Sequence, residues 1–241
     1  MDGILEIYDE YKNIGINTRK ITEGAEFELV TEFIQYRKEK FKPTSNKNLM
    51  IFIETKVNDS YPDIVFVEYN PSGYETWNHF RTKLTKMDYK ILYFIYFMRR
   101  ICAENIVLQL GVSWRDTLLS IERLYDAGLI IRQRNKWCIS NKKIFSVKNI
   151  QAVEAKINNL DSVLQQALIN KNFASESYVL SNLNRSIDDS RLEKFNNFGI
   201  GLYSKTNQRF NLVKKSNKVS IPVSYYSIIF NEWIGKILTT K

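Results

Sequence analysis

The segment VEAKINNLDSVLQQAL, residues 153–168, joins the end of an apolar strand to the start of a helix. Its first residues carry a carboxylate at Glu154 and an ammonium group at Lys156. Because alternate residues of a strand face the same way, these two side chains project together, roughly 6–7 Å apart along the strand. The pair is either a solvated strand end or part of a site, and the rest of the sequence bears on that choice.

The segment YPDIVF, residues 61–66, supplies a second carboxylate at Asp63. If the strand that follows Asp63 pairs with the strand of Glu154, the two carboxylates converge. With the backbone carbonyl of Ala155 and with waters they would form a hard oxygen site, which suits Mg²⁺ and would also accept Mn²⁺. Such a cation polarises a phosphodiester and lowers the pKa of a bound water. Lys156 would orient that water or neutralise the charge that develops in the transition state.

Further motifs follow in an order that resembles the PD-(D/E)XK nuclease superfamily. GAEFELV (24–30) is similar to the first helix of these enzymes, and FGIGLYS (198–204) is similar to a later strand. The resemblance covers about 22–69 and 145–205. It implies an α/β, restriction-endonuclease-like fold, in which helices flank a mixed central β-sheet. It also implies four catalytic residues, Asp63, Glu154, Lys156 and Gln166. The metal-binding residues that it implies are Glu26, Asp63, Glu154 and Ala155. For Gln166 two alternatives remain open: Gln165 takes this role, or Gln166 is an ordinary surface residue.

The chain departs from the family in the 91 positions that separate Asp63 from Glu154, where a short loop is usual. The excess is a segment that predicts three helices and a small basic hairpin with a turn at Arg134–Asn135. Its motif IERLYDAGLIIR (121–132) resembles a winged helix-turn-helix module. An insertion between strands is tolerated because loop-closure cost grows slowly with length. We therefore expect a nuclease domain in two parts, 1–80 and 142–241, interrupted by a winged-helix domain at 81–141.

The charge is unevenly distributed and is concentrated around this insert. Residues 1–78 hold 9 Lys/Arg and 14 Asp/Glu, residues 79–150 hold 14 and 5, and residues 151–241 hold 12 and 7. A local excess of positive charge predicts a polyanion as partner, and DNA is the expected one. In the third helix of the insert, Leu118, Ile121 and Leu124 should face the core, with Trp114 beside them. The expected DNA-binding residues are Arg115, Ser120, Arg123, Arg132, Arg134 and Lys136.

Other polar residues favour ordinary structural roles. Glu54 and Lys56 also form an E-x-K motif, but this pair precedes the PD element and is interpreted as a surface strand end. His79 is the only histidine, and no Cys or Ser forms a recognisable motif with it. The sequence therefore does not predict a catalytic triad or a zinc site. Residues 3–13 predict a short amphipathic helix.

The bulk composition predicts a cytoplasmic protein with a real core. Hydrophobic residues make up 44% of the chain, which excludes wholesale disorder. Cys102 and Cys138 lie in no metal-like spacing and indicate a reducing compartment. No signal peptide is recognised, and the longest apolar run, at 91–98, is too short to span a bilayer.

The sequence thus predicts a Mg²⁺-dependent DNA endonuclease, with restriction, phage defence or mobile-element processing as expected settings. Two alternatives remain open. One is a non-cleaving DNA-binding regulator on a nuclease-like scaffold, and the other is a structural subunit that uses the winged helix for protein contact. A homodimer and protein partners are compatible with all three, whereas a membrane is not an expected partner.

Overall fold

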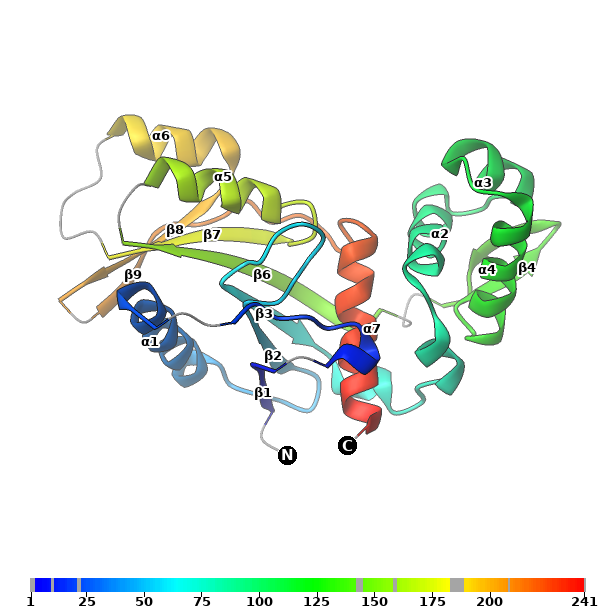
Figure 1. The fold of residues 1–241 in the computed structure, drawn as a ribbon, viewed down its shortest axis with the longest axis horizontal. Coiled ribbons are helices and arrows are strands. Elements are labelled where there is room, and N and C mark those ends of the chain that lie inside the picture. The colour runs from blue at the N-terminus through cyan, green and yellow to red at the C-terminus, as the bar shows by residue number, and fades with distance from the viewer. Residues whose placement is uncertain are drawn as a thin grey trace. The chain divides into compact units, whose positions relative to one another are not determined.

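A computed structural model describes residues 3–9, 11–20, 23–141, 145–157, 160–182, 189–207 and 209–240 (Figure 1). The chain divides into two compact units, Met1–Asn70 with Val147–Val223 and Pro71–Ser146 with Ser224–Lys241. The predicted α/β class is confirmed, because a seven-stranded mixed sheet is flanked by helices and a two-stranded hairpin lies apart from it.

The seven-stranded sheet belongs to the first unit and has the order β1-β2-β3-β6-β7-β8-β9. Strands β2, β3 and β6 pair antiparallel, β6, β7 and β8 pair parallel, β8 and β9 pair antiparallel, and β1 pairs parallel with β2. The strands are β1 (Ile4–Ile7), β2 (Asn48–Ile53), β3 (Ile64–Tyr69), β6 (Val147–Lys156), β7 (Glu176–Ser181), β8 (Gly201–Thr206) and β9 (Arg209–Lys214).

Helices cover both faces of this sheet, and strands β2 and β3 are apolar and buried at almost every position. Helix α1 (Ala25–Lys40) packs Leu29, Val30, Phe33 and Ile34 against one face. Helices α5 (Leu160–Asn170) and α6 (Asp189–Phe198) lie on the other face, where their apolar residues join β7 and β8 in a second cluster (Figure 1). The antiparallel pairing of β2 with β3 was predicted and is confirmed.

The predicted helix at residues 3–13 is wrong. Residues 4–7 form strand β1, and Lys12–Ile14 form one 3₁₀ turn. The reason is tertiary, because β1 gains a ladder with the buried strand β2, in which Ile4 pairs with Leu49. Pairing with an existing sheet outweighs the weak helical periodicity of so short a segment.

The second unit opens with two 3₁₀ turns, Pro71–Tyr74 and His79–Lys83, and then contains the three helices and the hairpin that the sequence predicts. They are α2 (Lys86–Met98), α3 (Ala103–Leu110), α4 (Trp114–Asp126), β4 (Ile130–Gln133) and β5 (Lys136–Ile139). Ser113 caps α4, since its hydroxyl accepts the N–H of Asp116 at 3.1 Å. Gly111 ends α3 with φ +62°, and Arg134 and Asn135 form the hairpin turn with φ values of 48° and 61°, as a two-residue primed turn requires.

The C-terminal helix α7 (Tyr225–Thr240) belongs to this second unit, whereas the sequence predicts that all of 142–241 belongs to the nuclease domain. Its Ile228 joins the core of α2–α4. Its Glu232 is fully buried and forms an ion pair with Arg81 at 2.5 Å. Asn231 accepts hydrogen bonds from the Tyr74 hydroxyl and the Ser146 N–H. These buried partners, which sequence periodicity does not identify, explain why α7 packs with this unit. None of the described helices is both long and apolar enough to cross a membrane.

Candidate active site

The register of β3 and β6 brings the two predicted carboxylates to the same place. Ile64 pairs with Val153, so Asp63, one residue earlier, stands opposite Glu154. Asp63 Oδ2 accepts the backbone N–H of Ala155 at 2.6 Å, which fixes the carboxylate against β6. The strand pairing on which the predicted site depends is therefore present.

The carboxylate of Glu154 is 3% exposed and has a single described hydrogen-bond partner. Its Oε1 accepts the Nδ2–H of Asn170, at the end of α5, at 2.6 Å. Burial and then the nearby charge of Asp63 raise the pKa of Glu154 to about 8, although the Asn170 hydrogen bond opposes both effects. The group holds a negative charge at neutral pH only with assistance from a neighbouring cation.

Burial likewise raises the pKa of Asp63. The Ala155 N–H and the charge of Arg19 oppose this effect, and the charge of Glu26 adds to it. Two neighbouring carboxylates with raised pKa values share one end of the sheet, and carboxylates of this kind cluster at functional sites.

A third carboxylate, Glu54, belongs to this group, so its interpretation as a surface strand end is wrong. It directly follows β2, where its backbone N–H donates to the Asp63 carbonyl at 3.2 Å. Its Oε2 accepts a hydrogen bond from Arg19 Nη2 at 2.7 Å. Burial and then the charge of Asp63 raise the pKa of Glu54 to about 7. Glu54 directly follows β2, a buried strand of the β2–β3 hairpin, and this position in the sequence was a signal that Glu54 lies near Asp63.

Lys156 and Glu26 face each other at the edge of the same site. Lys156 Nζ lies 2.8 Å from Glu26 Oε1, and both side chains are partly exposed. Glu26 lies in the first turn of α1, where the helix dipole favours a negative charge. Glu26 is therefore paired with the lysine of the predicted motif, across the site from Asp63.

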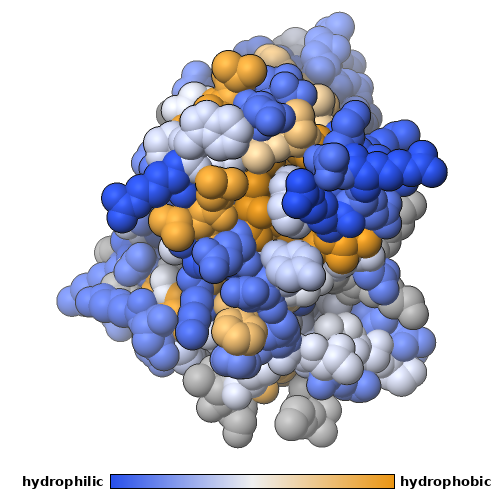
Figure 2. All heavy atoms as spheres, turned by 90° about the vertical axis from the view of Figure 1, so that its right-hand side faces the viewer, coloured by the Kyte–Doolittle hydropathy of each residue, from blue (hydrophilic) through white to orange (hydrophobic). Residues whose placement is uncertain are grey.

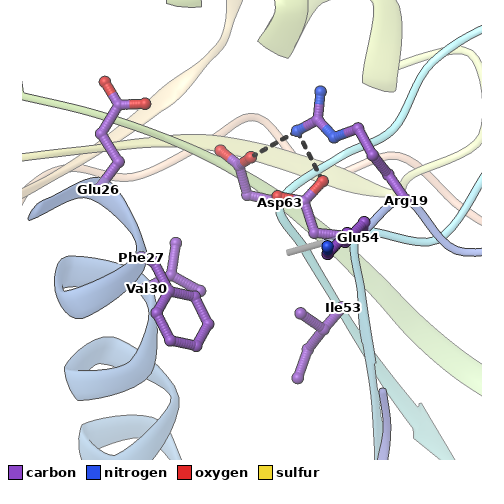
Figure 3. Close-up of a pocket in the computed structure, with 8 residues that line it drawn as sticks. Arg19, Glu26, Phe27, Val30, Ile53, Glu54 and Asp63 are labelled. Carbon is purple, nitrogen blue, oxygen red and sulfur yellow. Dashed lines mark hydrogen bonds and ion pairs between the residues drawn. The ribbon is translucent and has the colours of Figure 1, made fainter. Parts of the chain in front are cut away.

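A pocket of about 290 Å³ opens between α1 and the ends of β2 and β3. Figure 3 shows Arg19 reaching toward Glu54 and Asp63 on one side of this pocket, with Glu26 and Phe27 on the side of α1. Its lining combines an apolar floor with acidic and basic side chains: Arg19, Lys20, Glu26, Phe27, Val30, Ile53, Glu54 and Asp63.

The amide predicted from α5 comes from a different residue. Gln166 and Gln165 are both exposed, and neither has a described bond to a carboxylate of the site. Asn170, one helical turn after Gln166, supplies the contact to Glu154. The helix was located correctly, but its rotational phase decides which residue points at the sheet.

The donor set fits a hard divalent cation by its chemistry. Among the described residues no three His, Cys, Asp or Glu side chains form a ready metal cage. However, Asn170 Oδ1 is buried without a hydrogen-bond partner beside Glu154, whose pKa is raised by burial and by the negative charge of Asp63. Asp63, Glu154 and Asn170 thus offer oxygen atoms of the kind that Mg²⁺ and Mn²⁺ prefer. At Ala155 the described contact of the site is the N–H, donated to Asp63.

The predicted DNA-binding residues fall into two groups. Arg115 on α4 and the hairpin residues Arg132, Arg134 and Lys136 are exposed. Ser120 is fully buried and cannot reach a ligand. Arg123 donates two hydrogen bonds to the buried Asp88, at 2.7 and 2.9 Å, so its guanidinium group is engaged within the unit. The expected surface position of Ser120 is therefore wrong, because the inward face of α4 is wider than predicted, whereas the side chain of Arg123 is 35% exposed but is paired with Asp88.

The prediction of which α4 residues are buried in the core of this unit is also partly wrong. Ile121 and Leu124 are buried as expected. Leu118 and Trp114 are 53% and 49% exposed, so their predicted core position is wrong. Together with Tyr125, which is 56% exposed, they form a stripe along one side of the helix, which we call the α4 stripe.

Comparisons with known proteins give no family. No family model and no curated protein matches this chain. Among solved structures, the chain is similar to protein VC1899 from Vibrio cholerae with 9% sequence identity and a TM-score of 0.21, over 88% of this chain and 74% of that one. A likeness of this degree carries no argument about fold or function.

Proposed function

We propose that this chain is a metal-dependent DNA endonuclease of the PD-(D/E)XK type. The observation that carries the proposal is that Asp63, directly before β3, stands opposite Glu154 of β6, with Lys156 two residues beyond Glu154. Two buried carboxylates with raised pKa values are costly to keep together in a purely structural role. A bound cation and a phosphodiester substrate give that arrangement a function.

Asp63 and Glu154 would hold Mg²⁺ or Mn²⁺, and the ion would supply a positive charge to the phosphoryl oxygen and acidify a water molecule. Asn170 would keep Glu154 in its orientation through the 2.6 Å hydrogen bond. Lys156, kept beside the site by Glu26, would orient the attacking water or balance the charge of the transition state. By the family's pattern, the products would carry a 5′-phosphate and a 3′-hydroxyl.

A plasmid-nicking assay tests this proposal. Supercoiled plasmid should become nicked or linear in Mg²⁺ or Mn²⁺ and should stay intact in EDTA. Binding without any cleavage in either cation would favour the alternative, a non-cleaving DNA-binding regulator. We also propose a setting in restriction, phage defence or mobile-element processing. The fold class by itself does not distinguish among these three settings.

The exposed cations of the β4–β5 hairpin support a contact with DNA phosphates. We expect that replacing Arg132, Arg134 and Lys136 together by alanine will weaken duplex binding about tenfold or more near 0.15 M salt. The same variant should reduce the slope of log affinity against log salt by up to about three, one for each phosphate that these side chains no longer neutralise. Fluorescence anisotropy over a salt series measures both quantities. Gln133→Ala, in the same hairpin, is the matched neutral control.

A second candidate role, protein contact through the insert, is favoured by the α4 stripe. Seen from the side of α3 and α4, the molecule carries hydrophobic surface surrounded by hydrophilic side chains (Figure 2). A helix that reads the major groove needs polar and cationic side chains on its outer face. Helix α4 instead carries Trp114, Leu118 and Tyr125 there, together with the carboxylates of Glu122 and Asp126.

The charges of α4 favour a second copy of the chain as this partner. Arg115 lies near the start of the helix, and Glu122 and Asp126 lie near its end. The other two charged residues of α4 are engaged within the unit, Asp116 by Ser113 and Arg123 by Asp88. In an antiparallel two-fold contact the opposite charges at the two ends of the helix would face each other across the paired α4 stripes.

Leu118→Glu should therefore raise the dimer dissociation constant at least about tenfold in sedimentation velocity, because two buried leucines are replaced per dimer. Leu212→Glu, at an exposed leucine of β9, is the matched control and should leave the association unchanged. A wild-type chain that is monomeric at every concentration would exclude this role for the α4 stripe.

A further inference from the structure

The position of Arg19 is fixed by the backbone rather than by its side chain. The Arg19 N–H donates to the Glu54 carbonyl at 2.9 Å, and the Lys56 N–H donates to the Asn17 carbonyl at 2.8 Å. Thr18 and Thr55 form an antiparallel bridge between these two bonds. Residues 17–19 thus extend the end of the β2–β3 hairpin, and this pairing delivers Arg19 to the pocket.

The guanidinium group of Arg19 is only partly engaged. Its Nη2 lies 2.7 Å from Glu54 Oε2 and 3.9 Å from Asp63 Oδ1. Its Cζ lies 5.8 Å from the ring centroid of Tyr61. The side chain is 56% exposed, and within the described part of the chain it makes one side-chain hydrogen bond out of five available donors. Most of its hydrogen-bonding capacity therefore remains for a ligand.

Arg19 also sits where the site most needs positive charge. Glu54, Asp63 and Glu154 act on one another electrostatically, and each has a raised pKa because of burial and of its neighbours' charges. Within the described ranges, Arg19 is the cationic residue that donates a side-chain hydrogen bond to a member of this group, and Lys20 lines the same pocket. Arg19 thus provides part of the counter-charge that a bound cation would provide.

We propose that Arg19 is a phosphate-binding residue of this site, held in place by Glu54 until a divalent cation neutralises the carboxylates. The inference rests on the proposed nuclease function. The ligand is a phosphodiester group of a nucleic acid strand, which the planar fork of an arginine recognises through two parallel hydrogen bonds. Glu54 is a positioning residue in this scheme, since it orients the guanidinium group and releases it when its charge is compensated elsewhere.

The proposal makes cation binding and DNA binding cooperative through one side chain. A divalent cation held by Asp63 and Glu154 would also compensate the charge of the neighbouring Glu54, and this would free Arg19 for the phosphodiester. DNA that engages Arg19 in turn exposes the carboxylates to the cation. Thermodynamic reciprocity then requires each ligand to raise the affinity of the other by the same factor.

Fluorescence anisotropy of a labelled duplex, in Ca²⁺ and in EDTA, tests this coupling, and intact DNA is verified on a gel. Ca²⁺ is the probe because it takes the same kind of oxygen ligands. We expect Ca²⁺ to raise the DNA affinity of the wild-type chain at least about fivefold, which is the lower end of the affinity change typical of two coupled binding sites. For Arg19→Gln the increase should fall below about twofold, while Ca²⁺ affinity without DNA, measured by calorimetry, stays equal or rises. Arg19→Lys should lie between the two, because it keeps the charge but loses the fork.

Two controls keep the test decisive. Arg209→Gln, which removes an exposed arginine of β9, should leave the coupling intact. If Arg19→Gln does not fold, Glu54→Gln replaces it and should raise DNA affinity in EDTA toward the wild-type value in Ca²⁺, because the guanidinium group is released. Unchanged affinity there would overturn the inference.

The outcomes also separate this inference from the proposed function. A wild-type chain that nicks plasmid and binds Ca²⁺, with full coupling retained in Arg19→Gln, overturns the role of Arg19 alone. A wild-type chain that neither nicks plasmid nor binds a divalent cation overturns the nuclease proposal and this inference with it.

Discussion

Asp63→Asn is expected to lower the rate of Mg²⁺-dependent plasmid nicking at least about 10³-fold, equivalent to roughly 4 kcal/mol of transition-state stabilisation. The substitution removes the negative charge that would hold the cation. It keeps a side-chain oxygen that can accept the Ala155 N–H, so the connection between Asp63 and β6 survives. Rates under single-turnover conditions, with enzyme in excess, measure the effect on chemistry without a contribution from product release.

Lys156→Ala should produce a loss of about 10²–10³-fold in the same assay, because a positioned acid or cation typically contributes that much. Neither variant should change duplex affinity in EDTA by more than about twofold, since the hairpin cations supply the expected phosphate contacts. Glu68→Gln is the matched control, because it neutralises a carboxylate of β3 that is paired with Lys47. A large loss of binding in both site variants would mean that the reacting phosphodiester lies elsewhere.

Much of the fold could be predicted because its signals are local. The runs at β2 and β3 are apolar at nearly every position, and a short turn between them leaves an antiparallel hairpin as the simple solution. The insert was recognisable by its caps, since Ser113 and Gly111 mark helix ends in the way their chemistry requires. The pairing of β3 with β6 across 91 positions is not local, and the sequence offers it only as the condition under which the two carboxylates converge.

The residues that sequence reasoning missed are those whose environment is set by distant partners. Nothing near Glu54 in the sequence shows that Arg19 will bond to it, because that contact depends on an isolated bridge between Thr18 and Thr55. Asn170 replaces Gln166 because a helix turns about 100° per residue, so a modest error in phase changes which side chain faces the sheet.

The same sensitivity to helix phase explains why the predicted exposed and buried positions on α4 were partly wrong. Ser120 lies one residue before the predicted core position Ile121, and the actual buried arc of the helix includes both. Arg123 looked free in the sequence because its partner, Asp88, lies on another helix, where it also caps the start of α2. An arginine count therefore overstates the charge that the insert offers to DNA.

Glu154→Gln is expected to increase the stability of the metal-free protein at alkaline pH. The pKa of Glu154 is about 8 in the folded chain, whereas an exposed glutamate of the unfolded chain titrates near its ordinary pKa of 4.5. Between these values the folded state holds more protons, so the free energy of unfolding falls as pH rises from about 4.5 to about 8. The loss in the wild-type chain should be on the order of a few kcal/mol, because ionising this buried group opposes folding.

Urea unfolding in EDTA at pH 5 and at pH 8.5 measures this difference. The wild-type chain should lose stability between the two, whereas Glu154→Gln should lose markedly less, and Glu68→Gln should behave like the wild type. Glu54, whose pKa is raised to about 7, and Asp63, whose pKa is also raised, supply the pH dependence that remains in the variant. Saturating Mg²⁺ should restore wild-type stability at pH 8.5 and leave Glu154→Gln almost unchanged, because a ligand stabilises only the state that binds it. If Mg²⁺ stabilises both proteins equally, the cation binds away from Glu154, and the buried carboxylates then require a different explanation.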